Sequence, residues 1–189
     1  AAARLLGAMT QERANIALML MLGDPEPIVR LEAVNKANLN LSLINQRILY
    51  AAVNDPYEVV RIAAVRKALS SPLPEVRKDA EGFLADDSPR VVEMVVRSGG
   101  LSQSLLERAL LSPHPRVVGA ALQQLALAKK PVAADAVRHL FTSDNAMIQF
   151  GLAHLHASHA VKLPADVIER ILAGPSPGAK RLLQEAKGH

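Results

Sequence analysis

A short pattern recurs along the chain and restricts its fold more than any other feature. Each copy begins with Asp or Ser, usually followed by Pro, and places one apolar residue five positions on and another nine positions on. The copies start at Asp24, Asp55, Ser71, Asp87 and Ser112, with a weaker one at Ser143, and their apolar pairs are Val29/Ala33, Val60/Ala64, Val76/Ala80, Val92/Val96, Val117/Ala121 and Ile148/Leu152. Each copy predicts the start of a short amphipathic helix.

The residue types in the pattern are those that start a helix. Asp or Ser is expected at the N-cap, where its side-chain oxygen accepts from a free backbone N–H of the first turn. Proline fits that first turn because its missing N–H would have no partner there. The starts leave long intervals at 24–55, 87–112 and 112–143 and short ones at 55–71 and 71–87. A long interval therefore holds a helical hairpin, and a short one holds a single helix with its turn.

The long intervals and the stretch after the last copy predict partner helices at 41–53, 101–111, 132–141 and 164–172. Helices this short cannot bury their apolar faces alone, so neighbours are expected to stack around one continuous core. We predict an all-α fold, a right-handed superhelix of about a dozen short helices that forms one domain over residues 1–189. Residues 24–172 would hold the repeats, 1–23 the N-terminal helices and 175–189 a capping helix. The apolar run at 16–22 predicts a buried first helix or, if more repeats precede it, an exposed joint.

Composition agrees with helices and excludes several kinds of site. Half of the residues are apolar but only 3% are aromatic, and Ala, Val and Leu suit close helix packing. The absence of Cys excludes disulfides, thiolate nucleophiles and Cys-bound metals. No apolar run reaches about 18 residues, so we expect no membrane span. Residues 1–9 lack a basic run, so we expect no signal peptide and a cytoplasmic protein.

The segments DPEPIVR, DPYEVVR and SPLPEVR resemble the HEAT-repeat superfamily, in particular its bacterial HEAT-like branch, over most of residues 24–172. In that family an acidic loop residue and the Arg six positions later form a ladder between adjacent repeats. The resemblance implies this role for Asp24 with Arg30 and for Asp55 with Arg61. Later copies depart from it, with Arg77 alone and then Glu93, Val118 and Gln149 at the Arg position. Residues 87–111 are also similar to a leucine-rich-repeat-variant unit.

The sequence contains no recognisable catalytic constellation. It lacks a Gly-rich phosphate loop and a nucleophile elbow, and Gly99 and Gly100 are expected to end a helix. His154, His156 and His159 lie close together, and the last two would share a helical face, but no carboxylate completes a metal shell. We therefore expect no enzymatic activity, no cofactor, no metal and no small-molecule substrate.

The two halves of the chain differ in charge. Residues 1–94 carry 11 Lys/Arg and 12 Asp/Glu, whereas residues 95–189 carry 11 and 6. Basic residues also recur every 30 to 32 positions, and in a superhelix of that period they would align along the concave face. These candidate partner-binding residues are Arg47, Lys78, Arg108, Arg138 with the adjacent His139, and Arg170. A solvated polar face, or the repeat itself, would produce the same spacing.

A basic half favours an acidic protein surface or a nucleic-acid backbone as partner. Nucleic-acid recognition usually adds aromatic stacking or a dense basic patch, whereas the aromatic residues here are scattered and 129–130 is the single adjacent Lys pair. We predict a non-enzymatic scaffold or adaptor that binds a protein with an acidic or extended segment, within a larger assembly. Nucleic-acid backbone binding is the alternative. Some HEAT-like proteins are DNA glycosylases or bilin lyases, so an enzyme is a third class.

Overall fold

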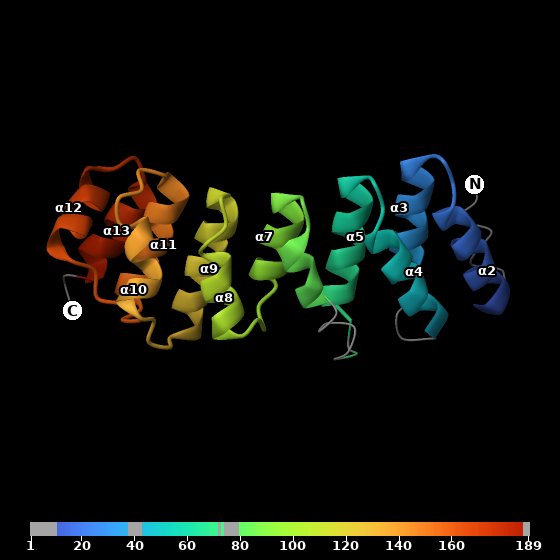
Figure 1. The fold of residues 1–189 in the computed structure, drawn as a ribbon, viewed down its shortest axis with the longest axis horizontal. Helices are drawn as coiled ribbons and strands as arrows, with labels where there is room; N and C mark the ends of the chain where they lie inside the picture. Colours follow the sequence, from blue (N-terminus) through green and yellow to red (C-terminus); the bar gives the residue numbers. More distant parts are fainter. Residues whose placement is uncertain (1–10, 38–42, 72, 74–79, 187–189) are drawn as a thin grey trace. The chain divides into compact units, whose positions relative to one another are not determined.

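The computed structural model describes residues 11–37, 43–71, 73 and 80–186, and these contain helices and no β-strand (Figure 1). This confirms the prediction of an all-α fold. The chain divides into two compact units, Ala1–Val95 and Val96–His189. The handedness of a superhelix and the single-domain organisation stay predictions.

The helices of the two units are short, mostly seven to fourteen residues long. The N-terminal unit contains α2 (Gln11–Leu22), α3 (Pro27–Lys36), α4 (Leu43–Val53), α5 (Glu58–Leu69), the 3-10 helix η1 (Ala80–Ala85) and most of α7 (Pro89–Arg97). The C-terminal unit contains α8 (Gln103–Ala109), α9 (Pro115–Ala128), α10 (Ala134–Val137), the 3-10 helix η2 (Arg138–Leu140), α11 (Ala146–Ala157), α12 (Ala165–Ala173) and α13 (Pro177–Ala186). The four predicted partner helices are thus confirmed as α4, α8, α10 with η2, and α12.

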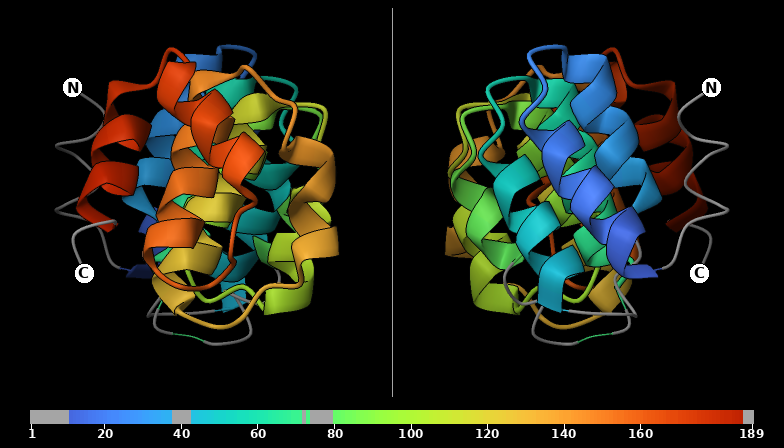
Figure 2. Two further views of the ribbon diagram at one scale, coloured as in Figure 1. Left: turned by 90° about the vertical axis from the view of Figure 1, so that its left-hand side faces the viewer. Right: turned by 90° about the vertical axis from the view of Figure 1, so that its right-hand side faces the viewer.

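In the N-terminal unit the pattern helices pack against each other and against their hairpin partners. The contacts join α2 to α3, α3 to α5 and α4 to α5, and α2 and α3 lie side by side in Figure 2. The core is small and aliphatic, with Val34, Leu49, Val60 and Ala64 all buried. Such residues allow helices to approach closely, as the Ala- and Val-rich composition predicted.

The C-terminal unit is built around α9 and α11, which pack against each other, while α11 also packs against α13 and α9 against α8. Leu122, Leu125, Leu152 and Leu155 are fully buried between these helices. Gly151 permits the close approach of α9 and α11, because a Cβ there would lie 2.6 Å from the Cβ of Leu122. This contact holds together the two helices that carry the pocket described below.

The first residue of each pattern forms a turn before the helix rather than the N-cap itself. Asp24 and Asp55 accept from the backbone N–H two residues on, at 2.9 Å in both cases. Ser71, Ser112 and Ser143 do the same. The N-caps are Glu26 and Tyr57 for the two Asp copies. The N-cap prediction is wrong by two residues because a proline follows each Asp, and an Asx turn forms before the helix can start.

The predicted register of the fourth copy is also wrong by one residue. Asp86, not Asp87, accepts from the N–H two residues on, at Ser88, at 2.8 Å. Ser88 then caps α7 by accepting from Arg90 N–H. The fully buried positions five and nine residues after Asp86 are Val91 and Val95. The start of this copy therefore follows Asp55 at the same interval that separates Asp55 from Asp24.

Helix α2 is present, but the prediction that its apolar run is buried is wrong for three side chains. Ile16, Met19 and Leu20 are 54, 49 and 74% exposed, whereas Leu18 is buried. Leu18 clusters with Ala33 of the adjacent helix α3 and with Ala37, which directly follows that helix. The exposed side chains lie at i, i+3 and i+4 and so share the opposite face.

Other predictions concern the ends of helices. Helix α7 ends at Arg97, and Gly99 and Gly100 follow with φ of 77° and 82°, which confirms the predicted helix stop. The predicted C-terminal helix is confirmed as α13, with Ala179 and Leu183 buried. Within the third copy, Val76, Arg77 and Lys78 lie outside the described residues.

Candidate functional site

The arginines that the resemblance assigned to a ladder are structural. The Arg30 guanidinium binds the Asp55 carboxylate through two hydrogen bonds, Nε to Oδ2 at 2.6 Å and Nη2 to Oδ1 at 3.0 Å. Its Nη1 donates to the carbonyl of Asp24 at 2.6 Å. Arg30 therefore links the turn that begins at Asp24 to the next turn along the chain, which begins at Asp55. The bidentate geometry is the strong form of an Arg–carboxylate pair.

The same arrangement repeats one helical hairpin later. Arg61 binds the Asp86 carboxylate at 2.9 Å and 3.1 Å and donates to the carbonyl of Asp55 at 2.9 Å. Asp55 thus accepts from Arg30 with its side chain and from Arg61 with its backbone. Burial alone would raise the pKa of Asp55, but the hydrogen bonds from Arg30 and from the Tyr57 N–H and the positive charges of both arginines hold that pKa below its ordinary value. Arg30 and Arg61 therefore hold successive turns together, and their guanidinium groups are already occupied by protein oxygens.

An uncharged version of the ladder continues in the C-terminal unit. Gln149 lies six residues after Ser143, as Arg30 lies six after Asp24, and its Nε2 lies 3.3 Å from the carbonyl of Ser143. Gly174 follows Ser143 at the interval that separates Asp55 from Asp24, and so occupies the position of the ladder Asp. A Cβ at this glycine would collide with the Gln149 carboxamide. Gln149 is almost fully buried, and its Oε1 has no hydrogen-bond partner among the residues that the structure describes.

The predicted partner-binding residues lie on the partner helices, at exposed positions. Arg47 is on α4, Arg108 in the last turn of α8, Arg138 at the start of η2 and Arg170 in the last turn of α12. Lys78 is outside the described residues. Arg138 pairs with Asp135 at 2.7 Å, and both side chains are more than 70% exposed. Neither Arg108 nor Arg170 forms an ion pair with any residue that the structure describes.

In the C-terminal unit, three of these elements are joined in sequence order by hydrogen bonds. The His139 Nε2 lies 3.2 Å from the carbonyl of Leu110, which links η2 to the end of α8. Gln103 at the start of α8 donates to the carbonyl of Pro131 at 3.1 Å. Val132 N–H in turn donates to the carbonyl of Ala160 at 2.8 Å, which links the segment before α10 to the segment before α12. Arg108, Arg138 and Arg170 therefore belong to elements that are joined one to the next, and their alignment along a concave face stays a prediction.

The histidines have separate surroundings. The His156 Nδ1 accepts from the Leu163 N–H at 3.2 Å, and His154 packs beside Phe150 with ring centroids 6.2 Å apart. His159 lies beyond the end of α11 with φ of 60°. The prediction that His156 and His159 share a helical face is wrong, because α11 ends at Ala157. Among the described residues, no group of three His, Asp or Glu side chains could hold a metal ion.

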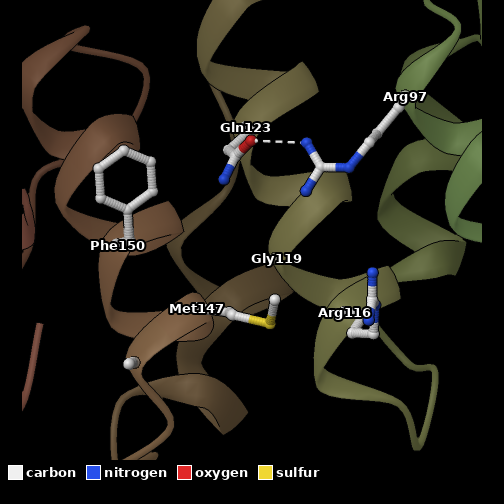
Figure 3. A pocket seen from close by; sticks show the side chains of 7 residues that line it. Arg97, Arg116, Gly119, Gln123, Met147 and Phe150 are labelled. Atoms are coloured by element: carbon white, nitrogen blue, oxygen red, sulfur yellow. Dashed lines mark hydrogen bonds between the residues drawn. The ribbon is translucent and has the colours of Figure 1, made fainter.

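A pocket in the C-terminal unit has no counterpart in the sequence predictions. It has a volume of about 190 Å³ and is lined by Arg97, Arg116, Gly119, Gln123, Ala146, Met147 and Phe150 (Figure 3). These residues come from the end of α7, from the first nine residues of α9 and from the start of α11. No sequence motif connects them. The one hint in the sequence is Gly119 inside a helix, since a helical glycine often marks close packing.

Comparison with known proteins does not assign this chain to a family: no family model matches it, and no curated protein matches it. In the part of the chain that the structure describes, none of the helices is sufficiently long and apolar to cross a lipid bilayer.

Proposed function

We propose that this protein is a non-enzymatic binding module, a scaffold or adaptor that recognises an acidic or extended segment of a partner protein. In this proposal the helical hairpins stack as a HEAT-like solenoid, and exposed arginines of the C-terminal unit make the contacts. The repeated turn and the ladder over Asp24–Asp86 support the solenoid. The equal spacing of the ladder residues Asp24, Asp55 and Asp86 along the chain supports it as well.

The observation that carries the proposal is the contrast between the ladder arginines and two exposed arginines of the C-terminal unit. Arg30 is buried and Arg61 is partly buried, each in a bidentate pair that joins turns. Arg108 and Arg170 are exposed, have no carboxylate partner among the described residues and belong to elements joined in order by hydrogen bonds. An exposed guanidinium without an internal partner is suited to bind a carboxylate on another molecule. Charge complementarity of this kind sets specificity and association rate.

Nucleic-acid backbone binding is the second candidate, because the same surplus of cations would attract phosphates. The placement of the aromatic residues favours the protein partner. Among the described residues, the exposed Tyr, Phe and Trp side chains are Tyr50 and Tyr57, and both lie in the N-terminal unit. The described part of the C-terminal unit therefore presents no exposed Tyr, Phe or Trp on which a base could stack.

The test compares binding of two polyanions to wild type and to a charge-reversed variant. The probes are a fluorescein-labelled Glu-rich peptide of about a dozen residues and a short labelled DNA duplex, each titrated at several salt concentrations. We expect Arg108→Glu with Arg138→Glu to weaken peptide binding about tenfold or more, the loss expected for charge-assisted hydrogen bonds. Helicity and the melting temperature should stay nearly unchanged, because both side chains are exposed.

The matched control is Arg13→Glu with Arg66→Glu, which makes the same change in net charge at exposed positions of the N-terminal unit. It should leave peptide binding close to wild type. Equal weakening by both pairs would show that the peptide senses only net charge, and would contradict a site. Tighter binding of the duplex, with affinity that falls steeply as salt increases, would replace the protein partner with nucleic acid. If neither probe binds, the proposal is wrong.

A further inference from the structure

The pocket on α9 and α11 has one apolar side and one polar side. In Figure 3, Met147 and Phe150 project from α11 on one side, and Arg97 and Arg116 lie on the other. Gly119 of α9 lies between them and contributes no side chain. A Cβ at this position would meet the Cβ of Met147 at 3.2 Å, so the glycine lets the two helices approach closely here.

The side chains on both sides of the pocket are held by neighbours. The Arg97 Nη1 donates to the Gln123 Oε1 at 3.1 Å, which fixes one guanidinium at the rim. The Phe150 ring packs against Gly178 of α13, where a Cβ would lie 3.0 Å from the ring carbons. A guanidinium has five N–H donors, so an arginine with existing contacts can still bind a further carboxylate. Arg97 and Phe150 are therefore held in place before binding, which lowers the entropic cost of ordering them.

The volume of the pocket indicates what can enter it. About 190 Å³ is less than the roughly 300 to 1,000 Å³ of pockets that enclose nucleotides, cofactors or drug-sized ligands. It is enough for one large apolar side chain. In protein interfaces a single buried apolar or aromatic side chain in a well-packed pocket often supplies much of the binding energy.

We propose that this pocket binds one apolar anchor side chain, such as Phe or Leu, from an extended segment of a partner protein, with an adjacent carboxylate paired to Arg116 and Arg97. The anchor contacts Met147 and Phe150, and the acidic neighbour binds the guanidinium groups at the rim. This inference rests on the proposed function and adds to it the kind of sequence that is recognised. The pocket lies on α7, α9 and α11, whereas the exposed arginines lie on α8, η2 and α12, so the anchor is a separate contact with its own sequence requirement.

The test uses three labelled peptides of about a dozen residues, alike in a Ser/Gly background except for a central Glu-Phe-Glu, Glu-Ala-Glu or Lys-Phe-Lys. Binding is measured by fluorescence anisotropy and, in parallel, by the methyl NMR signal of Met147 in protein labelled at the methionine methyl groups. We expect the Glu-Phe-Glu peptide to bind about tenfold more tightly than the other two and to shift the Met147 signal.

Arg116→Glu should weaken binding of the Glu-Phe-Glu peptide about tenfold. Lys162→Glu is the control, because it reverses one exposed charge in the same unit outside the pocket. The Met147 signal of the wild-type protein tests occupancy of the pocket even if the Arg116 variant is unstable. Binding of both acidic peptides with equal affinity and without a Met147 shift would overturn the pocket but leave the proposed function standing. Failure of every acidic peptide to bind would overturn both.

Discussion

Gly151→Ala is expected to destabilise the protein although alanine is the better helix former. In an unhindered helix, replacing Gly with Ala stabilises by about 1 kcal/mol. Here the new methyl group would lie 2.6 Å from Cβ and 2.8 Å from Cδ1 of Leu122. The Cβ cannot move by a simple rotation, so α9 and α11 must separate, and overpacking of this kind costs about 1–3 kcal/mol. We expect a net loss of about 1 kcal/mol from these two terms, measured by urea unfolding with circular dichroism.

A double-mutant cycle with Leu122→Ala tests the reason for this loss. Leu122 is fully buried, so truncating it alone should cost about 2–5 kcal/mol through the cavity it leaves. In the Gly151→Ala background, alanine at position 122 removes the contact at 2.8 Å with Cδ1 but keeps the Cβ at 2.6 Å, so only part of the clash is relieved and we expect a favourable coupling of about 0.5–1 kcal/mol. The control Gly82→Ala adds a Cβ with no atom within 4 Å and should be neutral or stabilising. A Gly151→Ala variant as stable as wild type, with additive effects in the cycle, would refute the packing argument.

Two further predictions concern the ladder. The pKa of Asp55 is below its ordinary value, so its ion pair stabilises the protein above about pH 4, and this stabilisation is lost as the pH falls further through the folded-state pKa. Asp55→Asn should therefore lower the urea midpoint at pH 7. It should also make the decrease of that midpoint between pH 5 and about pH 2 smaller than in wild type. A midpoint that falls with pH as steeply in the variant as in wild type would contradict this. Gly174→Ala should lower the melting temperature in calorimetry because it collides with Gln149, and Gln149→Ala should restore part of the loss. No recovery in the double variant would show that the collision is not the cause.

Local signals predicted most of the helices. Pro, Asp and Ser at the pattern starts act within one or two turns, so they mark helix starts directly in the sequence. The intervals between these starts leave room for further helices, and the partner helices at 43–53, 103–109 and 165–173 were predictable in this way. The residues at which the helices start could not be predicted exactly, because the same residue types form an N-cap and an Asx turn. Two adjacent carboxylates, Asp86 and Asp87, fit the pattern equally well. The contact that distinguishes them comes from Arg61, 25 residues away, and has no local signature.

The candidate sites differ in how far they could be predicted. Exposed basic positions repeat with the helices, so Arg108, Arg138 and Arg170 could be found from their interval. The pocket depends on which side chains of three helices meet, and Arg97, Arg116 and Met147 share no spacing. The one sign of the pocket in the sequence is Gly119, and its role in close helix packing is recognised only when the structure places Met147 beside it. Exposed positions that repeat at a regular interval can thus be predicted from the sequence. A pocket between helices can be predicted only when the packing of those helices is known.

The charge asymmetry of the chain does not come from the ladder, because each ladder pair joins one Arg to one Asp and adds no net charge. Both halves carry 11 Lys/Arg, so the C-terminal half is basic because it has 6 Asp/Glu where the N-terminal half has 12. In the N-terminal unit, Asp55 and Asp86 neutralise Arg30, which is buried, and Arg61, which is partly buried. In the C-terminal unit the equivalent rung is Gln149 facing Gly174, which needs no charge of either sign. Cations of that unit are then not required for joining turns, and those on α8 and α12 extend into solvent. Gln149 holds its own turn through the carbonyl of Ser143 without an ion pair, so the repeated turn does not depend on an Arg–Asp pair.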